Sequence, residues 1–414
     1  MNPFSYLRGE LYAEGVALSR IADEHGTPCY VYSKAALTEA FKAYDQAFAS
    51  RPHLICYSVK ANSSLAVLGV FAKLGSGFDI VSGGELARVL AAGGDPAKIV
   101  FSGVGKTAAE MRQALAAGVL CFNVESESEL LRLERITGEM GRRAAVSLRV
   151  NPDVDAKTHP YISTGLKENK FGVAFDDALR LYRMAKASAH LIIVGVDCHI
   201  GSQLVSVEPI ADAVGKLLML VDKLAAEGIE VEHLDFGGGL GIRYSEEVPP
   251  TQENWIRSLL NAIGTRPQKI LIEPGRSLVG NAGLLLTRVE YLKHGDARNF
   301  AVVDAAMNDL MRPALYNAFH EVLPVRQGDK AVRNYDVVGP VCESADFLAR
   351  NRKLEVREGD LLAIMSAGAY GMTMSSNYNS RPRASEVMVD GGRLHLVRDR
   401  ERVEQLYSGE RLAN

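Results

Sequence analysis

The sequence has no excess of charge of either sign. Its 414 residues include 47 Lys+Arg and 50 Asp+Glu, which gives a formal net charge of -3. A protein that binds nucleic acid or an anionic membrane usually carries a basic patch or a large positive charge. We therefore expect neither a nucleic-acid partner nor a membrane partner.

Cysteine pairs and long apolar runs are also missing. The five cysteines are scattered without Cys-x-x-Cys spacing, at Cys29, Cys56, Cys121, Cys198 and Cys342. This pattern is typical of reduced thiols rather than of a disulfide framework. The first 15 residues lack the apolar core of a secretory signal, and no uncharged apolar stretch reaches the ~18 residues of a membrane span. We expect a cytoplasmic protein without a bound metal.

Two glycine-rich stretches fail to match nucleotide-binding motifs. The stretch GVGKT (103–107) lacks the glycine that a Walker loop needs five residues before Gly105, because Val100 stands there. Gly237–Gly239 begin a dinucleotide-like sequence whose last glycine position is Ile242. The triple glycine still leaves backbone N–H groups unobstructed, which suits an oxyanion or a phosphate.

Short apolar runs alternate with helix-like segments between about residues 50 and 275. Eight runs are β-branched and nearly continuously apolar, as strands buried on both faces are: 53–59, 77–81, 98–102, 119–124, 144–150, 191–200, 231–236 and 269–274. The segments between them repeat apolar residues every three or four positions and close with glycine. This pattern favours a (β/α)8 barrel of the TIM type, while a doubly wound open sheet also fits the alternation.

The rhythm changes after residue 280. Strand-like runs now follow one another through turns that carry Gly and Asp, at 283–292, 300–305, 335–341, 360–366, 385–390 and 393–397. We predict a barrel over 33–279 and a mainly β C-terminal domain over 280–414. Residues 1–32, which lead into the strand-like TPCYVYS (27–33), are expected to join the β domain, although they also fit the barrel.

Polar or glycine-rich residues follow nearly every strand of the predicted barrel. Chemistry in such barrels is built at the carboxyl ends of the strands. The residues found there are Lys60, Asp79, Arg149, His199, Ser202, Gly237–Gly239, Glu273, Gly275 and Arg276. A single polar residue at a strand end often only begins a loop, but the coincidence across strands predicts one site at one rim.

Three of these residues have both a chemical and a structural interpretation. Burial of Lys60 would lower its pKa and suit a Schiff base, whereas an extended side chain would reach solvent. Glu273 needs a partner, either Arg276 or a protonated ring nitrogen of a cofactor. His199 is either a hydrogen-bonded core histidine or an imidazole stacked on an aromatic ring.

The β domain contributes its own candidates. Cys342 and Glu343 follow one predicted strand, and Tyr370 follows another. The cysteine is either a proton donor beside a carboxylate or a structural thiol. Arg312, near Tyr316, either clamps a carboxylate through two hydrogen bonds or is a surface charge.

The motifs around these residues resemble those of the fold type III pyridoxal-phosphate-dependent decarboxylases, and within them the diaminopimelate decarboxylases. The similar segments are YSVKAN (57–62), GFDIVSGGEL (77–86), HIGSQ (199–203), DFGGGLGIRY (235–244), EPGRSLVGNAG (273–283), MRPALY (311–316), GPVCESADFLAR (339–350) and SAGAYGMTMSSNYNSRPR (366–383). Residues 158–172 resemble the lid region of that family. The resemblance spans nearly the whole chain and implies an alanine-racemase-like barrel followed by a β domain.

The resemblance implies pyridoxal 5'-phosphate as the cofactor. Lys60 would bind it through a Schiff base, Glu273 would hold the pyridine nitrogen protonated, and His199 would stack on the ring. The other implied cofactor-binding residues are Asp79, Ser202, Gly238, Gly239, Gly275, Arg276 and Tyr370.

The resemblance also implies how substrate is bound. Glu343 would recognise the distal ammonium group, and Cys342 would supply the proton that replaces the lost carboxylate, which makes Lys60, His199, Glu273 and Cys342 the implied catalytic residues. The substrate-binding residues would be Arg276, Arg312, Tyr316, Glu343 and Tyr370. In this family Cys342 and Glu343 reach the barrel of the partner subunit, so a homodimer is expected.

The implied reaction converts meso-2,6-diaminopimelate to L-lysine and CO2, the last step of lysine biosynthesis. A carboxylate at the ring nitrogen favours decarboxylation over racemisation, because the protonated ring stores the charge left by CO2. The alternatives are decarboxylation of D-lysine, D-ornithine or arginine, a non-catalytic pyridoxal-phosphate-binding module, and a barrel enzyme without this cofactor.

Overall fold

The structure is a computed structural model that describes residues 3–152, 170–199, 201–328 and 331–413. It divides into two compact units. The barrel unit comprises Ala40–Ile242 and Val248–Ser277, and the β unit comprises Met1–Glu39, Arg243–Glu247 and Leu278–Asn414. The short segment Arg243–Glu247, inside the predicted barrel range, therefore belongs to the β unit.

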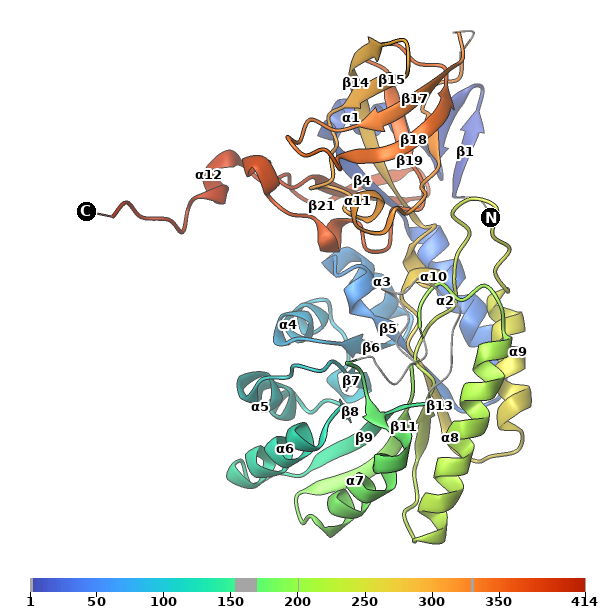
Figure 1. Cartoon of the computed structure of the whole chain (residues 1–414), viewed down its shortest axis with the longest axis vertical. Helices are drawn as coiled ribbons and strands as arrows, with labels where there is room; N and C mark the ends of the chain where they lie inside the picture. The colour runs from blue at the N-terminus through green and yellow to red at the C-terminus, as the bar shows by residue number, and fades with distance from the viewer. Residues whose placement is uncertain (1–2, 153–169, 200, 329–330, 414) are drawn as a thin grey trace. The chain divides into compact units, whose positions relative to one another are not determined.

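The barrel unit is a closed parallel barrel (Figure 1). The eight strands are β5 (His53–Ser58), β6 (Gly77–Ile80), β7 (Ile99–Phe101), β8 (Cys121–Val124), β9 (Ala144–Asn151), β11 (Leu191–Asp197), β12 (His233–Asp235) and β13 (Lys269–Ile272). Each strand pairs with the next one along the chain, including β8 with β9. The last strand, β13, pairs with the first, β5, and this pairing closes the ring. The predicted barrel is confirmed, and the open sheet is excluded. A short strand, β10 (Val173–Ala174), pairs with β9.

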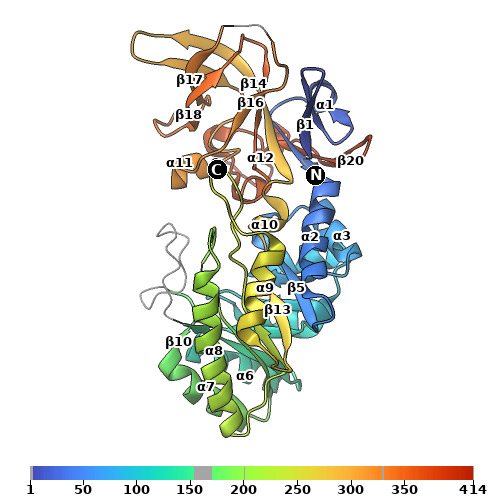
Figure 2. The ribbon, with the colours of Figure 1, turned by 90° about the vertical axis from the view of Figure 1, so that its right-hand side faces the viewer.

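Helices connect the strands and lie along their outside, as Figure 2 shows for α7, α8 and α9. Short polar side chains begin several of them: Ser82, Thr107, Ser126 and Thr251 each accept a hydrogen bond from a backbone N–H of the first turn. The connecting helices are α3 (Leu65–Lys73), α4 (Gly83–Ala91), α5 (Ala108–Ala117), α6 (Glu127–Glu139), α7 (Phe175–Ala187), α8 (Glu208–Ala226) and α9 (Gln252–Ile263), while α2 (Lys34–Phe48) precedes the first strand and α10 (Arg276–Val279) follows the last.

The β unit contains a mixed nine-stranded sheet and a separate three-stranded sheet. The larger sheet consists of β4 (Cys29–Ser33), β14 (Gly283–His294), β15 (Asn299–Val303), β16 (Val322–Pro324), β17 (Arg333–Val338), β18 (Phe347–Leu354), β19 (Leu361–Ile364), β20 (Ser385–Asp390) and β21 (Arg393–Arg398). Its fully buried strand β4 comes from the N-terminal segment and lies between β14 and β20. The smaller sheet is β1 (Phe4–Leu7), β2 (Glu10–Ala13) and β3 (Val16–Ala17), and the helices are α1 (Leu18–His25), α11 (Arg312–Tyr316) and α12 (Val403–Leu406).

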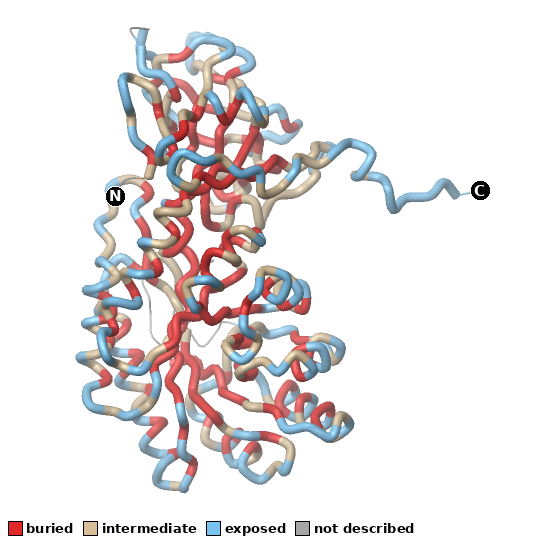
Figure 3. The backbone as a smooth tube through the Cα atoms, turned by 180° about the vertical axis from the view of Figure 1, so that it is seen from behind, coloured by how far each residue is buried: buried red, intermediate tan, exposed pale blue. Residues whose placement is uncertain are grey.

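In each unit, many of the buried residues lie on the strands. The barrel strands form a nearly continuous buried interior, drawn red in Figure 3. In the β unit, Val31, Leu284, Leu286 and Val387 pack into one apolar cluster with residues of β1 to β3. None of the described helices combines the length and the hydropathy that a membrane span requires.

Candidate functional site

Lys60 lies just beyond β5, on the short 3-10 helix η1 (Val59–Ala61). Its Nζ donates a hydrogen bond to Oδ2 of Asp79 at 2.7 Å, and the Ser58 hydroxyl donates to the same oxygen at 2.6 Å. Burial of Asp79 would raise its pKa, but attraction to Lys60 and the hydrogen bonds lower it overall. Of the two interpretations of Lys60, the structure supports the side chain that reaches solvent, because it is 39% exposed and paired with the Asp79 carboxylate.

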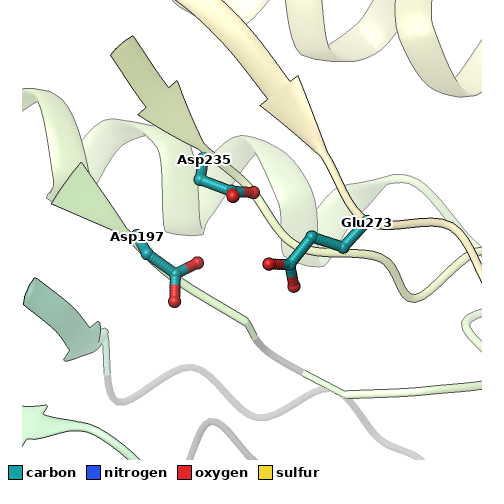
Figure 4. Close-up of side chains that lie close together, drawn as sticks. All are labelled: Asp197, Asp235 and Glu273. Atoms are coloured by element: carbon teal, nitrogen blue, oxygen red, sulfur yellow. The ribbon is translucent and has the colours of Figure 1, made fainter. Parts of the chain in front are cut away.

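Three carboxyl groups meet at the ends of consecutive strands. Asp197 ends β11, Asp235 ends β12 in register with it, and Glu273 directly follows β13. Their side chains point toward one another (Figure 4), and one oxygen of each lies within 4.8 Å of the others. All three residues are buried, with exposed fractions of 1%, 0% and 5%.

Three buried carboxylates this close cannot all ionise, because each charge disfavours the next. Burial raises the pKa of Asp235 to about 7, and burial together with Asp235 raises the pKa of Glu273 well above its usual range. The pKa of Asp197 is raised well above its usual range for the same two reasons. The cluster therefore retains protons at neutral pH, and a cation beside Glu273 would favour its ionised form.

Neutral donors support this cluster. The backbone N–H of Gly237 donates to Asp235 at 2.9 Å, and Ser102 and Asn123 each lie 3.4 Å from Oε1 of Glu273. Among the described residues, Asp197 Oδ1 and Asp235 Oδ2 have no hydrogen-bond partner.

His199 is held as a neutral imidazole. The Gly238 backbone N–H donates to its Nδ1 at 3.1 Å, so this nitrogen accepts and carries no proton. Burial lowers the pKa of His199 well below its usual value, and the positive charges of Arg149 and Lys60 lower it further. Gly237 has a φ of 62°, and a Cβ there would lie 2.3 Å from His199 Nδ1, so glycine is required.

The remaining barrel candidates form a group whose chemistry suits an anion. Arg276, 6% exposed at the start of α10, donates to the Ser202 hydroxyl at 3.0 Å. Gly239 has a φ of 120°, and a Cβ on Gly275 would lie 3.1 Å from the side chains of Ser58 and Ala61. Backbone therefore approaches closely here, and the cation and hydroxyl suit a phosphate.

The barrel residues fit pyridoxal phosphate. Lys60 supplies an amine, Glu273 supplies a carboxylate for a protonated ring nitrogen, and Arg276 with Ser202 supplies donors for a phosphate. The fully buried Asp79 retains one oxygen, Oδ1, without a hydrogen-bond partner among the described residues. A buried carboxylate oxygen of this kind costs folding free energy unless a polar group donates a hydrogen bond to it.

The predicted β-unit residues lie on loops and on a short helix. Arg312 begins α11 and is 7% exposed, and Tyr316 ends this helix. Cys342 and Glu343 are exposed on the loop between β17 and β18. Tyr370 follows β19 with a φ of 55°, a left-handed conformation that is uncommon for a tyrosine.

The Cys342 loop is fastened at several points. The Cys342 backbone N–H donates to Asn379 Oδ1 at 2.9 Å. The buried Asp346 accepts from the backbone N–H groups of Val341 at 2.9 Å and Met307 at 2.7 Å. The loop geometry is therefore fixed by carboxylate and amide side chains that lie within the similar segments but were not among the predicted site residues.

The structure thus brings nine predicted residues together in the barrel unit: Lys60, Asp79, His199, Ser202, Gly238, Gly239, Glu273, Gly275 and Arg276. The five others belong to the β unit: Arg312, Tyr316, Cys342, Glu343 and Tyr370. Residues 158–169 of the expected lid lie outside the described residues. Gly172, at the end of that segment, donates its N–H to Glu125 at 3.0 Å.

Several residues around the site were not among the predicted candidates. Asp197 interrupts an otherwise apolar strand, which was a usable signal, whereas nothing in the sequence pointed to Ser102 or Asn123. The lysine of the rejected GVGKT stretch, Lys106, is buried and donates to Glu129 at 2.7 Å and to the carbonyl of Asn123 at 2.7 Å. It belongs to the packing of the barrel wall.

Comparisons with known proteins agree with this chemistry. The family described as "Pyridoxal-dependent decarboxylase, pyridoxal binding domain" matches residues 34–280. Diaminopimelate decarboxylase of Pseudomonas aeruginosa is 62% identical over 412 residues, covering 100% of this chain and 99% of that protein. The Vibrio cholerae enzyme of the same name is 56% identical over 412 residues, with 99% of both chains covered.

Solved structures give the same relationship. Diaminopimelate decarboxylase from Helicobacter pylori, complexed with L-lysine, is 45% identical with a TM-score of 0.92, and the match covers 94% of this chain and 98% of that one. The M. jannaschii enzyme in complex with L-lysine is 37% identical with a TM-score of 0.95, and the match covers 100% and 98%.

Proposed function

We propose that this chain, which belongs to the diaminopimelate decarboxylase family of pyridoxal-dependent decarboxylases, converts meso-2,6-diaminopimelate to L-lysine and CO2. The observation that carries the proposal is Glu273, a buried carboxylate at a strand end of the same barrel rim as Lys60. A carboxylate at this position stabilises a protonated ring, as decarboxylation requires.

The barrel, over residues 33–279, would hold pyridoxal phosphate. When bound, this group supplies the electron sink for the pair left by the departing CO2. Lys60 would attach it through its side-chain amine, Glu273 would keep its ring nitrogen protonated, and His199 would stack on its ring. The phosphate would be bound by Ser202, Gly238, Gly239, the backbone of Gly275–Arg276 and Tyr370, and Asp79 would complete the site.

The β domain, over residues 280–414, would recognise the end of the substrate that does not react. Arg312 and Tyr316, with Arg276, grip the distal carboxylate, and Glu343 pairs with the distal ammonium. The bond from the α-carbon to its carboxylate breaks, CO2 leaves, and Cys342 Sγ gives its proton to that carbon. A cationic clamp beside an anionic group suits a substrate end that bears both charges.

A panel of CO2-release assays tests this proposal. Cofactor-loaded protein is supplied with meso-, LL- and DD-diaminopimelate, and with D-lysine, D-ornithine and arginine. We expect release from meso-diaminopimelate with equimolar L-lysine. Faster release from one of the other basic amino acids would support the second candidate, a decarboxylase of that substrate, and no release from any of them would refute both.

The proposed active unit is a homodimer in which Cys342 and Glu343 serve the barrel of the partner. Their exposure on a fastened loop supports this arrangement, because an exposed proton donor needs a water-excluding partner. When Lys60→Ala and Cys342→Ala proteins are mixed and exchange subunits, about a quarter of the wild-type activity should return, from the one intact site of each mixed dimer. No recovery despite proven exchange would place both residues in the site of one chain.

We also propose a cytoplasmic location. All five cysteines are free thiols, and Cys342 is exposed. A functional exposed thiol requires the reducing conditions of the cytoplasm. Labelling of Cys342 by a thiol reagent in intact cells, before and after oxidant, would test this: a thiol already oxidised in the cell would contradict it.

A further inference from the structure

His320 lies beside the predicted substrate-binding arginine in the interior of the β unit. It is fully buried, and its Nε2 is 2.9 Å from Nη1 of Arg312. On the other side of the ring, Nδ1 is 2.8 Å from the carbonyl oxygen of Met365. The imidazole thus joins the guanidinium of α11 to the backbone just after β19.

These two partners determine the protonation of the ring. A guanidinium can only donate, so Nε2 of His320 must accept and carries no proton. A carbonyl oxygen can only accept, so Nδ1 must carry the proton. His320 is therefore a neutral imidazole in one tautomer, and the same ring with a proton on both nitrogens would oppose the Arg312 N–H.

Tyr244 fixes the guanidinium in a second direction. The Cζ of Arg312 lies 4.6 Å from the centroid of the Tyr244 ring, a cation–π distance. The Tyr244 and His320 rings meet edge to face, with centroids 5.4 Å apart and planes at 77°. The Tyr244 ring therefore sets the plane of the guanidinium, and the hydrogen bond to His320 sets its rotation within that plane.

Backbone contacts keep His320 itself in place. Arg352 donates to the His320 carbonyl at 3.2 Å, and its guanidinium lies 4.0 Å from the Phe319 ring centroid. The backbone of His320 is thus held independently of Arg312. A rigid acceptor of this kind orients a long side chain that would otherwise lose rotamer entropy on binding substrate.

We propose that His320 is a positioning residue that aims the Arg312 guanidinium at the distal carboxylate of the substrate. The inference rests on the proposed function, in which Arg312 grips that carboxylate. His320 does not touch the reacting atoms, so it affects recognition of the distal end rather than the bond-breaking step.

Two ligands isolate this effect. L-lysine carries the distal carboxylate, and 1,5-diaminopentane has the same chain and both amines without it. Calorimetry on the cofactor-loaded protein gives a Kd for each, and the ratio of the two values measures the grip on the carboxylate. A general loosening of the site would raise both Kd values by a similar factor and leave their ratio unchanged.

Two substitutions separate the two hydrogen bonds of the imidazole. His320→Gln keeps an oxygen near the position of Nε2 as an acceptor for Arg312. His320→Asn keeps an N–H near the position of Nδ1 for Met365, but offers Arg312 no acceptor. The Asn variant therefore preserves the anchor and removes only the positioning contact.

His320→Asn should raise the Kd of L-lysine about tenfold, the effect of one lost charge-assisted hydrogen bond. The Kd of 1,5-diaminopentane should stay within about twofold, and His320→Gln should stay within about threefold for both ligands. In turnover, His320→Asn should raise the KM for meso-diaminopimelate about tenfold while kcat changes by less than about twofold.

Unchanged affinity of His320→Asn for L-lysine, or equal weakening for both ligands, would overturn the positioning role. If His320→Asn does not fold, His320→Met, which fills a similar volume without a strong acceptor, carries the same expectation. If the wild-type protein binds L-lysine no more tightly than 1,5-diaminopentane, Arg312 does not grip the distal carboxylate. This result would overturn the proposal. CO2 release from meso-diaminopimelate, measured in parallel, then shows whether the proposed function still stands.

Discussion

The barrel and the β unit carry their candidate residues on different kinds of element. In the barrel, the candidates lie at or just beyond the ends of parallel strands, and Asp79, Glu273 and Arg276 are buried, at 0%, 5% and 6% exposure. In the β unit, Cys342 and Glu343 are exposed on a loop. In the proposed function, a rigid scaffold would therefore bind the cofactor, whereas the substrate would be recognised by segments that can vary without disturbing that scaffold.

Removing the amine of the barrel site should have the largest effect. Lys60→Ala should lower kcat by ~10⁴-fold or more, because the covalent attachment to the cofactor is lost. CO2 release measures this, and the exposed Lys73→Ala is the matched control, expected at wild-type activity. Activity retained by Lys60→Ala would move the chemistry away from the barrel.

The carboxyl cluster should cost stability as the pH rises. The pKa of Asp235 is about 7 in the fold and ~3.9 in an unfolded chain, so the folded state binds the proton more tightly. The penalty is absent below pH ~4, grows between the two values and is complete above pH 7. Asp235→Asn, which keeps the acceptor for Gly237, should therefore add up to about 4 kcal/mol of stability at pH 8 and little at pH 4.

Urea unfolding followed by fluorescence measures this effect, because the single tryptophan, Trp255, is buried on helix α9 of the barrel. Asp222→Asn is the control. Its pKa is lowered by the exposed pair with Arg266, so that variant should show a small effect of the opposite sign. A stability gain from Asp235→Asn that does not grow with pH would mean that the pKa of Asp235 is not raised in the fold.

The smallest effect is expected at the loop of the β unit. Glu343→Ala should lower kcat/KM for meso-diaminopimelate by about tenfold, because one charge-assisted contact to the distal ammonium is lost. It should also narrow the preference for this substrate over other amino acids. The exposed Glu410→Ala should behave as wild type. An unchanged substrate preference would show that Glu343 does not recognise the distal group.

Much of the barrel could be predicted from the sequence, because strands buried on both faces appear as continuous apolar runs. The β unit was harder. Strand β18, FLARNRKL, has charged residues at exposed positions, and β16 is only three residues long, so neither showed an apolar run. The strands β1 to β3 are two to four residues long and were missed for the same reason.

The candidate site also contains residues that local sequence predicts and residues that it does not. Residues inside motifs, such as Lys60 and Glu273, were predicted as candidates from local sequence. The carboxyl cluster depends on three strands that align Asp197, Asp235 and Glu273 across about 76 residues of chain, and no local pattern encodes that alignment. The contact of His320 with the Met365 carbonyl likewise arises only from tertiary packing.

Lys60 as the attachment point of the cofactor is tested by reduction of the cofactor-loaded protein with borohydride, followed by peptide mass mapping. We expect one modified peptide, with the pyridoxal mass on Lys60, and loss of that mass when excess meso-diaminopimelate is present before reduction. Modification of a different lysine, or a Lys60 peptide that stays unmodified in a protein that releases CO2, would contradict this attachment point.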